Sequence, residues 1–82
     1  DLMFENIMMN LRLKEGMNRK EFLDRYGISV DEAYPSSLRL LKQSGLIEED
    51  DEMIRATDHG YEILNDVLEV FLDEAEERKK LH

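Results

Sequence analysis

The stretch that decides the fold is GLIEEDDEMIRATDHG, residues 45–60. Gly45 is expected to end the helix before it, because glycine adopts the left-handed conformation of helix ends without steric cost. Two short apolar segments then flank an all-acid turn, Asp50-Asp51-Glu52, a pattern that predicts a two-stranded hairpin. Thr57 is expected to cap the next helix, because its hydroxyl can accept a hydrogen bond from a free backbone amide. The stretch therefore predicts a helix, a hairpin and a second helix, in that order.

Apolar residues spaced three and four positions apart predict three helices upstream of the hairpin. These helices are expected over Leu2–Leu13, Arg19–Tyr26 and Pro35–Ser44, with a loop containing one helical turn between the second and the third. Asn18 is expected to cap the second helix, with Glu21 in the reciprocal position of a capping box. The inward-facing side chains are expected to be Phe22, Leu23 and Tyr26 in the second helix and Leu38 and Leu41 in the third, with Leu40 beside them.

Downstream of the hairpin, the same spacing predicts one long helix that starts after Thr57 and runs to about Lys79. Its inward-facing residues are expected to be Tyr61, Leu64, Val67, Leu68, Phe71 and Ala75. Two pairs on its surface, Glu74 with Arg78 and Glu76 with Lys80, have the spacing of ion pairs that contribute a few tenths of a kcal/mol each. The elements together predict a mainly α, winged-helix-like fold of three helices, a two-stranded β-hairpin wing and a long C-terminal helix.

Length and composition restrict the class of protein. Eighty-two residues fit a single small domain, 1–82, with little room for a deep catalytic cleft. The absence of cysteine excludes disulfides, thiolate catalysis and cysteine-held metal sites in this chain, and it suits a cytoplasmic protein. No apolar run approaches the roughly 20 residues that span a bilayer, so no membrane partner is expected. The chain begins at Asp1 rather than at a methionine, which suggests a fragment of a longer protein.

The charge distribution opposes nucleic-acid binding. Twenty acids against 11 bases give a net charge of −9, whereas phosphate binding depends on neutralisation by Lys and Arg. In a DNA-binding winged helix, the third helix enters the major groove and the wing contacts the backbone. Here the third helix offers only Arg39 and Lys42, and the wing carries five consecutive acids, residues 48–52. Whether this run is a solvated turn or a functional feature, we expect no nucleic-acid partner.

Patterns of catalytic and metal-binding residues are missing from the sequence. Neither His59 nor His82 has a second histidine four positions away, so no helical chelate exists, and His59 is interpreted as a polar surface residue. The acid run lacks the glycine and the spacing of a calcium loop. The serines have no histidine nearby in the sequence, and there is no Gly-rich phosphate loop. We therefore assign no catalytic, cofactor-binding or metal-ligating residue.

The first helix is apolar around more of its circumference than one buried face requires. Four residues share one face and three more widen it: Phe4, Ile7, Met8 and Leu11, then Leu2, Met9 and Leu13. Met3 and Met9 fall outside the main stripe. Methionines often fill gaps in a core, but exposed apolar area of this kind also marks interfaces. We expect this helix to contact another part of the protein, and the isolated chain to self-associate weakly or to leave this area exposed.

Several segments are similar to a known family. Glu5, Met8-Met9 and LRLKEG at residues 11–16 resemble the stretch that opens the C-terminal domain of oxygen-independent coproporphyrinogen III oxidase-like proteins. These are radical S-adenosylmethionine (radical SAM) proteins of haem metabolism. The similarity continues at Phe22, Tyr26-Gly27, Ser44 to Ile47, Thr57 to Gly60, Asn65, Val67 and Phe71-Leu72. Ala56 departs from the family pattern, which usually has a larger aliphatic residue there.

The resemblance implies a non-catalytic accessory domain that packs on the N-terminal radical SAM barrel of the same protein. In the family, that barrel holds a 4Fe-4S cluster on a CxxxCxxC motif and binds S-adenosylmethionine. This chain has no cysteine, so the resemblance implies both cofactors for the parent protein and neither for this chain. The family includes coproporphyrinogen oxidases and haem chaperones, and both remain open for the parent.

Seven residues are carried over as family-motif or interface candidates: Met9, Arg12, Gly16, Gly45, Thr57, Gly60 and Asn65. Arg12 and Gly16 are predicted at the junction between the domains, with an ordinary surface salt bridge as the alternative for Arg12. The alternative function is a stand-alone acidic winged-helix module that binds protein or, as the weaker option, regulates transcription by binding DNA.

Overall fold

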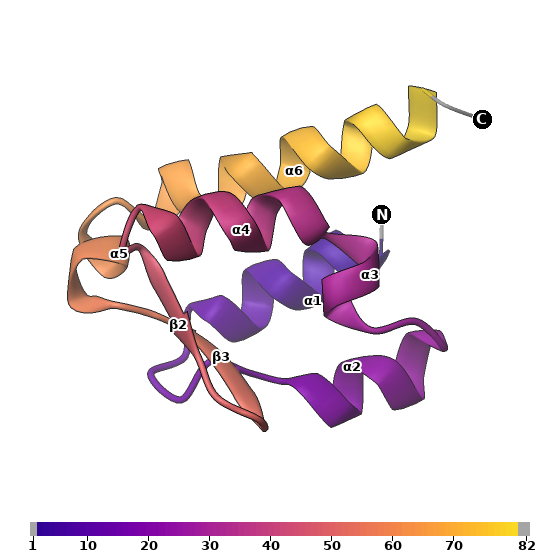
Figure 1. Cartoon of the computed structure of the whole chain (residues 1–82), viewed down its shortest axis with the longest axis horizontal. Coiled ribbons are helices and arrows are strands. Elements are labelled where there is room, and N and C mark those ends of the chain that lie inside the picture. Colours follow the sequence, from indigo (N-terminus) through magenta and orange to yellow (C-terminus); the bar gives the residue numbers. More distant parts are fainter. Residues whose placement is uncertain (1, 81–82) are drawn as a thin grey trace.

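The computed structural model describes residues 2–80, which form six helices and a small antiparallel sheet at one edge of the molecule (Figure 1). The helices are α1 (Leu2–Leu11), α2 (Arg19–Tyr26), α3 (Val30–Ala33), α4 (Pro35–Gln43), α5 (Asp58–Glu62) and α6 (Leu64–Lys80). The strands are β1 (Met17–Asn18), β2 (Ile47–Glu49) and β3 (Met53–Ala56). The predicted mainly α fold is confirmed, and its assignment as a winged helix stays a prediction.

The predicted helix ends follow from local hydrogen bonds. The side chain of Asn18 accepts from the Glu21 backbone N–H at 2.9 Å and begins α2, and the Thr57 hydroxyl accepts from the Gly60 N–H at 3.1 Å and begins α5. Gly27 and Gly45 have φ angles of 70° and 72°, the left-handed conformation that ends helices. These caps confirm the predicted boundaries of α2 and the end of α4 to within a residue.

The sheet has one strand more than the sequence predicts. Strand β3 lies in the centre, with β2 and β1 paired to it in antiparallel register through Ile47↔Ala56 and Met17↔Ile54. The β2–β3 hairpin is the predicted one. Strand β1 is only two residues long, so alternation along the sequence cannot reveal it.

A single apolar cluster lies between the helices and the sheet. In Figure 1, α4 and α6 run side by side along one edge of the molecule, and α1 also packs on α6. Buried side chains from these helices, from α2 and α3 and from all three strands form the cluster: Ile7, Leu11, Met17, Phe22, Val30, Ala33, Tyr34, Leu38, Leu41, Ile47, Ile54, Val67, Leu68, Phe71 and Ala75. Tyr34 and Phe71 meet edge to face, with ring centroids 5.6 Å apart. None of the described helices is long and apolar enough to cross a membrane.

Two predicted helices differ in extent. The C-terminal helix is broken at Ile63 into α5 and α6, because α5 packs against β3 while α6 packs against α1 and α4, and the chain must turn between them. The first helix ends at Leu11 rather than at Leu13. Residues 12–16 instead form a turn, closed by Gly16 N–H donating to the Leu13 carbonyl at 3.0 Å, which carries the chain back to pair as β1.

Three predictions of side-chain burial are corrected. Leu23 is 45% exposed because α2 buries only Phe22 in the core, with Tyr26 tilted against that ring. Leu40 is 51% exposed because Leu38 and Leu41 hold the buried side of α4. Met3, predicted to lie outside the buried stripe, is partly buried and packs against the core.

Candidate interaction surfaces

Three of the seven candidate residues meet where α4, the hairpin and α5 join. The Thr57 hydroxyl donates to the Gly45 carbonyl at 2.7 Å, and the Thr57 N–H donates to the Leu46 carbonyl at 3.1 Å. Gly60 is buried, and a Cβ added there would overlap the Leu46 carbonyl oxygen. These residues therefore close the base of the hairpin, a structural role that accounts for their pattern in the sequence.

Arg12 and Gly16, predicted at a domain junction, lie in the turn between α1 and β1. Gly16 is buried at φ 81°, and a Cβ there would overlap the Ile54 carbonyl oxygen of β3. The Arg12 carbonyl accepts from the Tyr61 hydroxyl at 3.3 Å, and its side chain is exposed. No ion pair within residues 2–80 involves Arg12, so the salt-bridge alternative finds no partner there.

The exposed apolar area of α1 is the clearest candidate for an interface. Met9 is 68% exposed and Leu2 is 75% exposed. Their spacing of seven positions, about two helical turns, places both on the same face of the helix. Leu13, just beyond the end of α1, is 46% exposed. We call Leu2, Met9 and Leu13 the α1 strip. Asn65, the remaining candidate, is exposed at the start of α6.

Much of the acid run in the hairpin is held by internal contacts. The Glu49 carboxylate accepts from Lys42 and from Arg19, whose guanidinium also pairs with Asp31. Hydrogen bonding from Lys42, with further support from Arg19, lowers the pKa of Glu49. Part of the run therefore ties α2, α3 and α4 to the sheet.

The Asp50 carboxylate shapes the turn of the hairpin. It accepts from the backbone N–H groups of Met53 and Glu52 at 2.8 Å each and from Arg55 at 3.0 Å. These contacts lower the pKa of Asp50 from 3.8 to about 2. Within the described part of the chain, no three His, Cys, Asp or Glu side chains are placed to hold a metal ion.

The structure brings no catalytic pair together among the residues it describes. The exposed His59 imidazole lies 3.7 Å from the Glu62 carboxylate, one turn along the helix. Ser29 caps α3, and Ser37 bonds to Glu74 and to the Val70 carbonyl. His82 lies outside the described residues.

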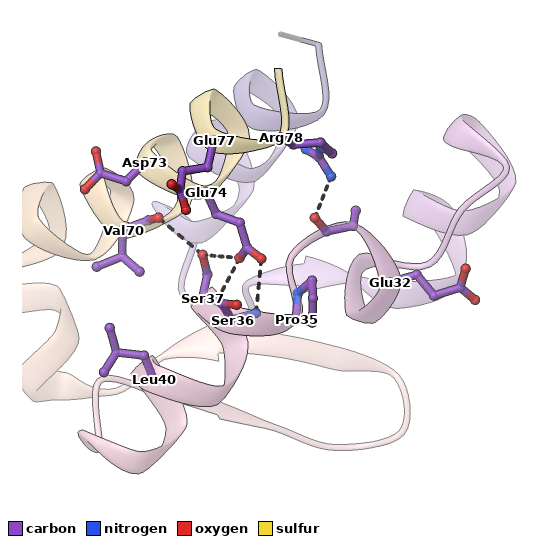
Figure 2. Close-up of a pocket in the computed structure, with 11 residues that line it drawn as sticks. Glu32, Pro35, Ser36, Ser37, Leu40, Val70, Asp73, Glu74, Glu77 and Arg78 are labelled. Carbon is purple, nitrogen blue, oxygen red and sulfur yellow. Dashed lines mark hydrogen bonds between the residues drawn. The ribbon is translucent and has the colours of Figure 1, made fainter. Parts of the chain in front are cut away.

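Glu74 has a role that the sequence analysis missed. Its carboxylate accepts from the backbone N–H groups of Ser36 and Ser37 at 3.1 and 2.8 Å and from the Ser37 hydroxyl at 2.6 Å (Figure 2). Tyr34 stands at the N-cap of α4 and offers no capping side chain, so Glu74 of α6 caps α4 across the tertiary fold. The signal in the sequence that could have indicated such an acceptor is a helix start after an aromatic residue, which leaves the first turn without a capping side chain.

Arg78, the predicted partner of Glu74, contacts α3 and the residue that follows it. Its guanidinium donates to the Ala33 carbonyl and lies over the Tyr34 ring, 4.8 Å from the centroid. Burial raises the pKa of Tyr34, with Arg78 opposing the shift. The second predicted pair, Glu76 with Lys80, is not among the ion pairs of residues 2–80.

Comparison with known proteins identifies the family. The model of the HemN C-terminal domain family matches residues 1–63, so the match ends where α6 begins. The chain belongs to this family, and the resemblance inferred from the sequence is confirmed. It is 34% identical over 70 residues to the heme chaperone HemW of Bacillus subtilis (strain 168), an alignment that covers 85% of this chain and 18% of that relative. No solved structure matches the chain significantly.

Proposed function

We propose that this chain is the non-catalytic C-terminal accessory domain of a longer radical SAM protein of haem metabolism, and that it packs on the barrel preceding it. Membership of the HemN C-terminal domain family supports the proposal, as does the small share of the HemW relative, 18%, that the chain spans. The 4Fe-4S cluster and S-adenosylmethionine then belong to the barrel, because this chain has no cysteine to hold a cluster. Because the similar protein is named a heme chaperone, we propose haem handling as the role of the parent.

The observation that carries the docking proposal is the α1 strip. Leu2 and Met9 leave more than two thirds of their surface in water, and burying each against a partner would contribute about 1–2 kcal/mol. In the family, this helix follows directly from the barrel, so a contact along it closes no long loop. The DNA-binding alternative is disfavoured, because the hairpin presents acids where a wing would meet phosphates.

The substitution Met9→Glu tests the proposed contact. In the 82-residue chain we expect the free energy of unfolding to change by less than about 0.5 kcal/mol, because the site is exposed. In the longer protein, or with the barrel supplied separately, the same substitution should weaken docking about tenfold or more, because it places a charge in an apolar contact. Leu23→Glu is the matched control, since Leu23 is an exposed apolar residue of α2.

Three results would refute this docking surface. The first is a loss of several kcal/mol in the 82-residue chain carrying Met9→Glu, which would make Met9 part of the core. The second is docking to the barrel that Met9→Glu leaves unchanged. The third is equal weakening of docking by Leu23→Glu. Isothermal calorimetry between the chain and a barrel that lacks it measures docking, and urea unfolding of the chain measures stability.

A further inference from the structure

A groove between the start of α4 and the second half of α6 is a surface separate from the α1 strip. It encloses about 600 Å³, and Figure 2 shows Leu40 and Val70 on one side of it, with Asp73 and Glu77 projecting from α6 above. Its apolar lining comes from Ala33, Pro35, Leu40 and Val70. Leu40, which the sequence places beside the inward-facing Leu38 and Leu41, is 51% exposed.

The charged side chains of the groove form two sets, those that contact other parts of the fold and those that form no ion pair within residues 2–80. Glu74 caps α4, and the Arg78 guanidinium is directed to the Ala33 carbonyl and the Tyr34 ring. The other three carboxylates, Glu32, Asp73 and Glu77, are exposed and enter none of the ion pairs in residues 2–80. The groove therefore has an apolar lining and an acidic rim whose three carboxylates form no ion pair within residues 2–80.

We propose that this groove binds a basic amphipathic peptide segment of a partner protein. An apolar side chain of the segment packs on Leu40 and Val70, and its Lys or Arg residues pair with Asp73 and Glu77. These two acids are four residues apart on α6, about one turn or 5–6 Å, which matches basic residues spaced by one turn on a helical partner.

The chemistry of the groove selects this occupant among the alternatives. Phosphates and anionic lipid headgroups are repelled by the rim. A second copy of the chain also carries a net charge of −9, so bringing two copies together is opposed by long-range repulsion. A positively charged polypeptide with an apolar anchor satisfies both the lining and the rim.

Fluorescence anisotropy with a defined probe tests the proposal. The probe is a labelled, amidated peptide of Leu and Lys, about 14 residues long, with Leu at helical spacing so that it forms an amphipathic helix. We expect saturable binding to the 82-residue chain that weakens as salt is added. The control peptide has the same Leu pattern with Glu in place of every Lys, and it should not bind.

Two charge-reversal variants separate the groove from the overall charge. Asp73→Lys with Glu77→Lys alters the rim, and Asp51→Lys with Glu52→Lys alters the exposed tip of the hairpin. Each double variant changes the net charge from −9 to −5, because every reversal adds two charges. The rim variant should weaken binding by about tenfold or more and the tip variant by less than about threefold, because only the rim pairs directly with the peptide. Circular dichroism establishes that both variants remain folded.

Several outcomes would overturn the proposal. They are the absence of saturable binding up to about 1 mM, equal weakening by the two double variants, and equal binding of the Glu peptide. The residues whose amide signals shift in an NMR titration should lie on α4 and α6. Shifts confined to the α1 strip would show that the peptide binds there and not in the groove. Concentration-dependent dimerisation that the rim variant abolishes would make a second copy the occupant. None of these results bears on docking through the α1 strip.

Discussion

Removing the Glu74 carboxylate should destabilise the chain through α4, although Glu74 lies on α6. The substitution Glu74→Ala deletes three hydrogen bonds at the first turn of α4, to Ser36 N–H, Ser37 N–H and the Ser37 hydroxyl. Ser36 is exposed, so water replaces its partner. The Ser37 hydroxyl keeps the Val70 carbonyl as an acceptor at 3.2 Å. The Ser37 N–H, in a residue only 1% exposed, is left without a replacement.

The expected loss in the free energy of unfolding is about 2 kcal/mol. An unsatisfied buried N–H costs about 1–3 kcal/mol, and loss of a helix N-cap costs about 0.5–2 kcal/mol. Both ranges describe the same lost contact, so they are not added. Glu74 is partly exposed, so water screens its charge and the upper end of the range does not apply. For a domain of this size, 2 kcal/mol lowers the melting temperature by about 10 °C.

Urea unfolding followed by circular dichroism measures the loss, with two matched variants beside it. Glu76→Ala removes the same side chain from an exposed site two residues away and should stay within about 0.5 kcal/mol of the parent chain. Glu74→Gln keeps a carbonyl acceptor without the charge and should lose about 1 kcal/mol. If Glu74→Ala is no more destabilising than Glu76→Ala, α6 does not cap α4 and the reasoning fails.

Two further predictions concern the hairpin and the helix α5 that follows it. Gly60→Ala should lower the free energy of unfolding by about 3 kcal/mol, because the Cβ of the new alanine would overlap the Leu46 carbonyl oxygen. The control is Gly27→Ala, whose Cβ would meet nothing within 4 Å and which should lose about 1 kcal/mol through the positive φ alone. Equal losses of stability in the two variants would contradict the packing argument. The lowered pKa of Asp50 stabilises the fold above pH 3.8, and this contribution is lost as the pH falls toward about 2. An NMR titration of the carboxyl groups should show Asp50 titrating near pH 2. Asp50→Asn should remove the part of the loss of stability at low pH that Asp50 causes. Titration of Asp50 near pH 3.8 would exclude the turn contacts.

The features predicted from the sequence are those that neighbouring residues determine. Asn18 and Thr57 cap helices through amides three residues ahead, and the acid turn reverses a short hairpin. Such contacts depend on residue type and spacing alone. The exposure of Met9 was also predictable, because helical spacing separates it from the stripe of buried residues.

The features that the sequence left hidden depend on contacts between distant segments. Strand β1 exists because Gly16 can lie against the backbone of β3, 38 residues later at Ile54. Leu40 has an apolar side chain like those of the core, but its position on α4 places it in the groove. The periodicity of apolar residues shows which face of a helix is the most hydrophobic, but it does not show how many other helices or strands cover that face. For the same reason, Glu74 was assigned to its neighbour along α6 rather than to α4.

Six acids of this chain fall into two groups, according to whether their carboxylates stabilise the fold. Glu49, Asp50 and Glu74 receive hydrogen bonds that join separate elements or shape the hairpin, so neutralising them should weaken the fold. The carboxylates of Glu32, Asp73 and Glu77 receive none of the hydrogen bonds found in residues 2–80, and Asp73 and Glu77, four residues apart on α6, repel each other. Reversing the charge of Asp73 and Glu77 should therefore leave stability unchanged or slightly raised while binding of a basic segment is lost. An acidic surface that contributes nothing to folding, placed around an apolar lining, is best explained by a partner that supplies the missing positive charge.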